Sequence, residues 1–155
     1  MSMQALKDAL CAHAAAALIF SEENGFYFTG FHSTNAVIFA TGSTAVYFTD
    51  SRYLEAAKQQ IKGFDDICDL QSFAQSVKPV IDKSDVKTIL VEGERLSVSR
   101  FETVKQALPD YDLSFDKLDE IINNIRAVKT QDEIENIVRA QRIAEAALDL
   151  LRPEI

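Results

Sequence analysis

Hydrophobic residues alternate along the chain between short apolar runs and segments with helical spacing. The runs predict buried strands, which are "ALIF" (17–20), two runs within residues 35–49, "DICDL" (66–70) and "KTILVEG" (87–93). The two runs within 35–49 are separated by Gly42 and Ser43, which predicts a β-hairpin. "SEENG" (21–25) has the composition of a turn.

The segments between these runs predict helices over residues 3–16, 51–63, 72–82 and 97–108. Asp50 or Ser51 is the expected cap of the second helix and Gly63 its expected stop. An extended piece, "YDLSF", and a helical segment, "DKLDEIINNI", follow and end near residue 125. The alternation of strands and helices predicts an α/β fold.

The last segment predicts one long amphipathic helix. Thr130 precedes Glu133 by three residues, which is the pattern of a capping box. Apolar residues then repeat at helical spacing over more than five turns, from Ile134 to Leu151. We expect this helix to belong to a domain that the chain lacks, because "NNIRAVKTQ" before it is typical of a polar joint. The alternative is that the helix packs back on the α/β unit.

Composition narrows the range of functions. The 155 residues are 47% hydrophobic and 26% charged, with a net charge of −8. This charge argues against nucleic acid and anionic membranes as partners, since both require clustered Lys and Arg. The sequence contains no apolar run long enough to span a membrane, and its start lacks the basic region of a signal peptide. With only two cysteines, in no metal or redox spacing, we expect a reduced cytoplasmic protein.

Candidate chemistry is sparse. His13 and His32 lack metal-ligand spacing, and His32 and Ser33 are neighbours whose side chains would point to opposite sides of an extended segment. The acidic pairs 65–66 and 92–94 lie at predicted element ends, where we expect them to face solvent. Cys11 and Cys68 fall among apolar residues, where a thiol is usually inert. The chain is therefore not expected to be an enzyme on its own.

Three segments in order resemble the amino-terminal region of the creatinase/prolidase/aminopeptidase P family of metallopeptidases. They are "YFTGFHSTNAVIFAT" (27–41), "VYFTDSRYLEAA" (46–57) and "IINNIRAVKTQDEIENIVRAQRIAEAAL" (121–148). The resemblance implies a small mixed sheet with a β-hairpin flanked by helices, followed by one long C-terminal helix. It also implies that residues 1–125 form the family's N-terminal α/β domain. Residues 126–155 would be the linker and first helix of a truncated catalytic domain of the "pita-bread" type.

The resemblance further implies a parent enzyme that cleaves Xaa-Pro bonds, as an aminopeptidase or a dipeptidase. Such enzymes use two divalent metals, expected as Mn²⁺, which are held by Asp, His and Glu residues of the catalytic domain. None of these ligands corresponds to a residue of this chain, so we expect no cofactor and no catalytic residue here. The chain is then a fragment of a longer peptidase, whose partners are its own catalytic domain, a second subunit and a proline-containing peptide.

Three residues that follow "TGF" are candidates for a substrate-pocket wall by the same resemblance, namely His32, Ser33 and Asn35. Arg52 is a fourth candidate, because a guanidinium suits a substrate carboxylate or a contact with the partner subunit. The alternative for Ser33, Thr34 and Asn35 is that they only satisfy the backbone of a turn at the entry to a strand. The alternative for Arg52 is an ion pair with Asp50 or Glu55. Arg126 and Lys129 are the expected interdomain contacts.

Two other functions remain open at this point. A stand-alone version of the fold would serve as a peptide- or protein-binding module, and an acidic one would suit a basic partner. A creatinase-like amidinohydrolase would keep the family and change the substrate. Both alternatives share the fold, so the residues that separate them from the peptidase lie outside these three segments.

Overall fold

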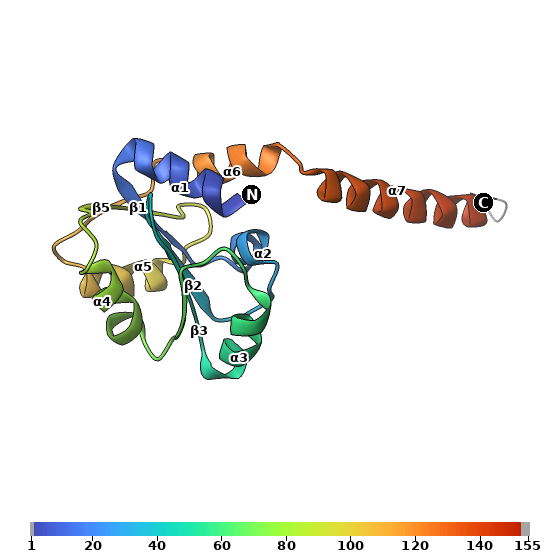
Figure 1. Cartoon of the computed structure of the whole chain (residues 1–155). Coiled ribbons are helices and arrows are strands. Elements are labelled where there is room, and N and C mark those ends of the chain that lie inside the picture. The colour runs from blue at the N-terminus through green and yellow to red at the C-terminus, as the bar shows by residue number, and fades with distance from the viewer. Residues whose placement is uncertain (1, 153–155) are drawn as a thin grey trace. The chain divides into compact units, whose positions relative to one another are not determined.

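A computed structural model describes residues 2–152, and within them the strands form one six-stranded mixed sheet in the order β4-β3-β2-β1-β5-β6 (Figure 1). Strand β2 is antiparallel to both of its neighbours, β1 and β3, whereas the pairs β1–β5, β5–β6 and β3–β4 are parallel. Five strands therefore run in one direction. The expected α/β fold with a mixed sheet and a long last helix is confirmed.

The strands are short and come close to the predicted ranges. Their bounds are β1 Ala15–Ile19, β2 Ala36–Ala40, β3 Ala45–Thr49, β4 Asp66–Asp69, β5 Thr88–Val91 and β6 Asp112–Ser114. The predicted hairpin is β2–β3, in which Ala40 pairs with Ala45 across the turn at Gly42 and Ser43. Its apolar runs form strands because β-branched and aromatic residues pack well on a pleated surface.

The helices are α1 Ser2–His13, α2 Glu22–Thr29, α3 Ser51–Gln60, α4 Lys78–Ile81, α5 Val98–Ala107, α6 Leu118–Ala127 and α7 Gln131–Leu151. One prediction was wrong, since residues 21–25 begin helix α2 instead of forming a turn. The helix expected over 72–82 is present, and it begins with a π-helical turn, η1 (Phe73–Val77), that continues directly into α4. The expected stop at Gly63 lies three residues beyond the end of α3.

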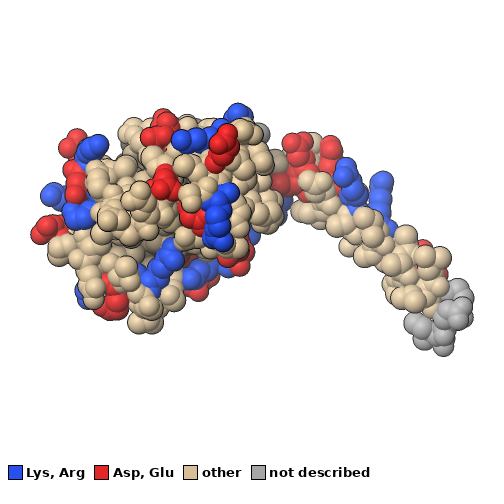
Figure 2. Space-filling model, turned by 90° about the horizontal axis from the view of Figure 1, so that it is seen from below, with Lys and Arg blue, Asp and Glu red and all other residues tan. Residues whose placement is uncertain are grey.

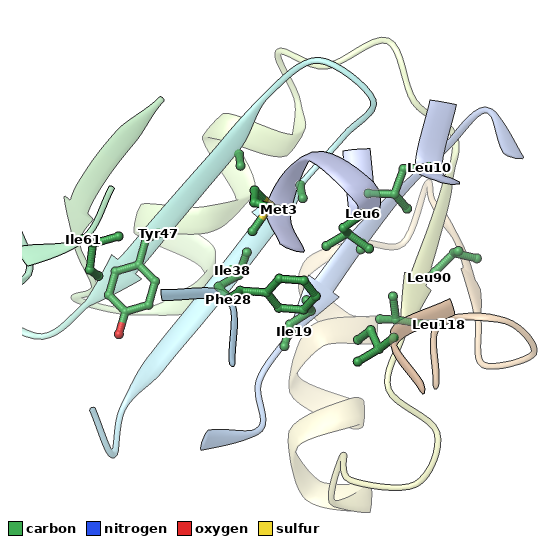
Figure 3. Close-up of a cluster of buried hydrophobic side chains, with 14 of the residues drawn as sticks. Met3, Leu6, Leu10, Ile19, Phe28, Ile38, Tyr47, Ile61, Leu90 and Leu118 are labelled. Carbon is green, nitrogen blue, oxygen red and sulfur yellow. The ribbon is translucent and has the colours of Figure 1, made fainter. Parts of the chain in front are cut away.

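Two hydrophobic clusters fill the two faces of the sheet. The first joins the sheet to α1, α2, α3 and α6 (Figure 3), and its labelled members are Met3, Leu6, Leu10, Ile19, Phe28, Ile38, Tyr47, Ile61, Leu90 and Leu118. The second joins the opposite face to η1, α4 and α5. In β1, successive residues alternate between the clusters, since Ala17 belongs to the first and Leu18 to the second. The sheet is thus the middle layer of three.

Residue contacts divide the chain into two units, unit 1 (Met1–Ile125) and unit 2 (Arg126–Ile155). Unit 2 consists mainly of α7, whose capping box is present as predicted: Thr130 accepts from the Glu133 N–H, and the Glu133 carboxylate accepts from the Thr130 N–H. Whether unit 2 belongs to a further domain stays a prediction. None of the helices in residues 2–152 has the length and apolar character needed to cross a membrane.

Candidate functional site at the carboxyl edge of the sheet

The candidate residues gather at one edge of the sheet. Because β1, β3, β4, β5 and β6 run in one direction, their carboxyl ends meet at the same edge, which we call the carboxyl edge. The antiparallel strand β2 begins there, so His32, Ser33 and Asn35 precede it at this edge. Arg52 follows the end of β3 at the same edge. Ligands of open α/β sheets commonly bind at this position.

A buried carboxylate, Glu92, organises the start of α2. It is fully buried and accepts hydrogen bonds from the N–H groups of Phe20 (2.6 Å) and Ser21 (3.0 Å), from the Ser21 hydroxyl and from the Asn24 amide (2.7 Å). The expectation that Glu92 faces solvent was therefore wrong. Its charge lies at the N-terminus of α2, where a helix favours an anion, and with four donors around it the carboxylate has a structural role.

The turn after α2 sends Phe31 into the core and leaves His32 at the surface. Gly30 caps the helix in the left-handed region (φ 67°), which glycine adopts without a steric penalty. Phe31 then enters the first hydrophobic cluster, and the exposed His32 ring stacks on Phe26 with 4.1 Å between ring centroids and 16° between planes. Phe26 is 42% exposed, so this aromatic pair lies at the surface.

Ser33 belongs to a partly buried hydroxyl cluster. Its Oγ shares a 2.9 Å hydrogen bond with Thr49 Oγ1, and it accepts from the Asn35 N–H at 3.4 Å. Burial raises the pKa of the adjacent Tyr47 phenol, although hydrogen bonds with Ser33 and Thr49 oppose that rise. These contacts are those of a turn that satisfies its own polar groups.

Asp50 connects two of the candidates. Arg52 donates to it with Nε (3.0 Å to Oδ1) and Nη2 (2.7 Å to Oδ2), and Asn35 Nδ2 reaches Oδ2 at 3.5 Å. The hydrogen bonds from Arg52 lower the pKa of the Asp50 carboxyl. Arg52 also lies over the Tyr53 ring, 5.4 Å from its centroid. The structure thus shows the ion pair between Arg52 and Asp50, and Asp50 is the residue that brings Asn35 and Arg52 together.

Ser33, Asn35, Thr49, Asp50 and Arg52 together form what we call the edge cluster. Ser33 and Phe26 line a cavity of only about 10 Å³, which is at the lower limit for one water molecule. A cavity of this volume is too small to enclose a peptide. The edge cluster and the stacked His32 therefore offer hydrogen-bonding groups and an aromatic face at the carboxyl edge.

Arg126 and Lys129 lie in unit 2, away from the candidates of unit 1 in the sequence. Lys129 Nζ donates to the Ala127 carbonyl at 3.2 Å and is exposed, while Arg126 is half-buried. Nothing in these contacts tests an interdomain role. That role stays a prediction.

Comparison with known proteins decides the family. Residues 3–128 match the family model described as the Creatinase/Prolidase N-terminal domain. The chain belongs to this family. The match covers all of the sheet and every helix of the α/β layers, so the sequence resemblance to the family is confirmed.

Two curated relatives carry peptidase names. This creatinase/prolidase N-terminal domain is 32% identical to a putative Xaa-Pro aminopeptidase of Mycoplasma genitalium over 87% of this chain and 36% of that protein. It is 28% identical to the uncharacterized peptidase YqhT of Bacillus subtilis over 89% of this chain and 40% of that protein. The chain thus spans about two fifths of the length of these relatives.

A solved structure shows the same fold. The Xaa-Pro dipeptidase from Bacillus anthracis superposes with a TM-score of 0.86 over 99% of this chain and 43% of that chain, at 23% identity. At this sequence identity the structural similarity establishes the fold of the creatinase/prolidase N-terminal domain. It carries no argument about which residues bind a ligand.

The residues of the domain do not fit a metal pair. Among residues 2–152, no group of three or more His, Cys, Asp or Glu side chains is placed to hold a metal ion. Burial, together with Asp66, raises the pKa of the Cys68 thiol to about 11, which favours its protonated form at neutral pH. Cys11 is exposed, contrary to its expected apolar surroundings.

Proposed function

We propose that this chain is the non-catalytic N-terminal domain of an Xaa-Pro peptidase of the aminopeptidase P or prolidase type. Membership of the creatinase/prolidase N-terminal domain family carries the proposal. The peptidase names of the relatives support it, as does the fold shared with an Xaa-Pro dipeptidase. The domain forms part of the substrate entrance and takes part in oligomer assembly.

The carboxyl edge is the part of the domain that would meet a substrate. His32 on Phe26 offers an exposed aromatic face, and the edge cluster beside it offers hydrogen-bonding groups. Side chains of these types hold a peptide in place without breaking a bond. His32, Ser33, Asn35 and Arg52 are therefore proposed as wall residues. Arg52 forms an ion pair with Asp50 in this structure. It would reach a substrate carboxylate only after that ion pair breaks.

The bond cleavage belongs to the rest of the parent enzyme. The family resemblance implies two divalent metals, proposed as Mn²⁺, which when bound lower the pKa of a water and supply a hydroxide nucleophile. Because no group of described residues fits these metals, no step of that chemistry is assigned to this chain. The proposed partners are the catalytic domain, which Arg126 and Lys129 would contact, a second subunit, and a proline-containing peptide as substrate.

We place the protein in the cytoplasm. Both cysteines are free thiols, which suits a reducing compartment. On the face seen in Figure 2, acidic and basic side chains are interspersed over unit 1, which is consistent with a net charge of −8 and with a partner other than nucleic acid.

The test is the substitution His32→Ala in the protein as its source organism makes it, with Thr34→Ala as the matched control. Both residues are exposed in the same loop, and only His32 stacks on Phe26. We expect H32A to change KM for Xaa-Pro peptides, or the preferred peptide length, by about tenfold, and T34A to leave both unchanged. If H32A and T34A give the same KM, kcat and length preference, the wall role is wrong.

Two alternatives have their own support. A peptide- or protein-binding module would share this fold and would use the hydrogen-bonding groups of the carboxyl edge without any metal. A creatinase-like amidinohydrolase would share the N-terminal fold and differ in the catalytic part. Activity of the source protein toward Xaa-Pro peptides, compared with small guanidino compounds, separates the two enzymes.

A further inference from the structure

A second pocket opens at the carboxyl edge, on the face of the sheet that α4 and α5 cover. It has a volume of about 240 Å³ and lies between the start of β2 at Asn35, the chain that follows β4 at residues 70–73, and helix α5. This volume falls below the ~300 Å³ at which pockets for drug-sized ligands begin, so it admits a group of about one amino-acid residue.

The floor of the pocket is apolar. Val37 and Val104 are buried members of the second hydrophobic cluster, and Leu70 and Phe73 pack against the same cluster. A ligand that fills this space must therefore bring an apolar body, because a polar one would lose its hydration without gaining partners.

The rim of the pocket is polar and carries one charge. Arg100 is the only charged side chain among the described residues that line it, in a protein whose net charge is −8. Its guanidinium lies over the Phe20 ring, 5.2 Å from the centroid, and the Phe20 ring is 6.1 Å from that of Phe73. These ring contacts place the guanidinium beside the apolar floor.

The surrounding charges leave Arg100 available to a ligand. The salt bridges among the described residues join other groups, and the basic residues in them are Lys7, Arg52, Lys78 and Arg95. Asp50 is the carboxylate that accepts a hydrogen bond from the pocket residue Asn35. Its charge is already paired with Arg52, which donates two hydrogen bonds to it. An anion in the pocket would thus meet a cation without a competing carboxylate on the lining.

We propose that this pocket binds an apolar carboxylate, of the kind that a peptide presents at its C-terminal residue. The guanidinium of Arg100 supplies the planar fork that matches a carboxylate, and the floor takes the side chain. No acidic side chain among the described lining residues is available to pair with an ammonium group. A blocked amine, as in a peptide, is therefore favoured over a free amino acid. The inference concerns binding by unit 1 and does not depend on peptidase activity.

The experiment is a titration of the ¹⁵N-labelled 155-residue chain, followed by amide chemical shifts, with N-acetyl-L-leucine, N-acetyl-L-leucinamide and L-leucine. We expect saturable shifts at the pocket amides, such as those of Gln71, Phe73 and Val104, with N-acetyl-L-leucine. The uncharged amide and the free amino acid should bind at least about tenfold more weakly. Equal binding of N-acetyl-L-leucine and its amide, or shifts confined to other parts of the chain, would overturn the proposal.

Two substitutions and one control sharpen the test. Arg100→Gln removes the charge at an exposed helix position and should weaken binding about tenfold, whereas Arg95→Gln, on the neighbouring loop and outside the pocket lining, should leave it unchanged. Thr103→Phe fills the pocket from the exposed side of α5 and should abolish binding while Arg100 remains. Unchanged affinity in both R100Q and T103F would show that the ligand binds elsewhere.

Discussion

Unit 1 and helix α7 contain the same kinds of apolar residue at regular spacing, and they differ in what those residues contact. In unit 1, Phe39, Phe48 and Leu18 are at most 1% exposed because helices cover both faces of the sheet. No residue of α7 is buried, and Ile137 and Leu148 are 54% and 62% exposed. The spacing of apolar residues therefore specifies a strand or a helix with an apolar face. Whether that face contributes to stability depends on a second element that covers it.

The largest expected difference between the two regions is the response to losing an apolar side chain. Phe48→Ala should lower the free energy of unfolding by about 3–5 kcal/mol, because it removes a fully buried ring from the second hydrophobic cluster. Leu148→Ala in α7 should change it by no more than about 0.5 kcal/mol. Urea unfolding of both variants of the 155-residue chain measures this difference, and similar losses in the two would contradict the comparison.

Loss of the buried carboxylate should have the next largest effect. Glu92→Gln replaces an anion that accepts four hydrogen bonds by an amide that must itself donate, and should cost about 2–3 kcal/mol. Glu94→Gln is the matched control, since Glu94 is exposed two residues away. Urea midpoints measure both variants. A midpoint for E92Q equal to that of E94Q would mean that the carboxylate does not hold the start of α2.

A smaller effect is expected in α7. Thr130→Ala breaks the capping box and should destabilise the start of the helix by about 1 kcal/mol. Amide hydrogen exchange should show faster exchange at Glu133 and Ile134, whose N–H groups bond to Thr130. Since contacts divide the chain at residue 125, the urea midpoint of unit 1 should not move. A shift of that midpoint would show that the two units unfold together.

The smallest expected effect depends on pH. Hydrogen bonds from Lys7 and from the Ala45 N–H lower the pKa of Asp65 in the folded state. Its stabilisation is therefore present above the unfolded pKa of about 3.9 and is lost as pH falls through the folded pKa. Because the Asp65 side chain is 51% exposed, it contributes at most about 1 kcal/mol. The difference in urea midpoint between wild type and Asp65→Asn should be present at pH 7 and shrink at pH 3. If the difference in urea midpoint is the same at pH 7 and pH 3, the ionised Asp65 carboxylate is not its source.

The features that local patterns encode could be predicted from the sequence. Strands β2 and β3 follow from two apolar runs around a short turn, and the cap of α7 follows from Thr130 and Glu133. Helix α2 was missed although its own sequence holds a cap and a stop, since Ser21 accepts from the Asn24 N–H and Gly30 ends the helix. What local patterns could not predict is that Glu92, 71 residues beyond Ser21, accepts hydrogen bonds at its start. The same long-range contact explains why Glu92 is buried although charged residues at element ends usually face solvent.

The candidate site was predictable in part. The sequence proposed His32, Ser33, Asn35 and Arg52 as candidates, and the fold brings all four to the carboxyl edge, while their role as wall residues stays a prediction. The ion pair between Arg52 and Asp50 is local and was among the sequence alternatives. Sequence patterns did not indicate that Asn35 reaches the same carboxylate or that the His32 ring stacks on Phe26, because these contacts depend on how the loop before β2 meets the end of β3 and the exposed side of α2.

The most direct test of the central claim is to isolate the protein from source cells with an antibody against this domain and to measure its mass and its cleavage of an Xaa-Pro peptide. We expect a species well above the 17.3 kDa of this chain, with cleavage that EDTA abolishes and divalent metal restores. A single species at 17.3 kDa without cleavage would contradict the peptidase assignment and support the binding module.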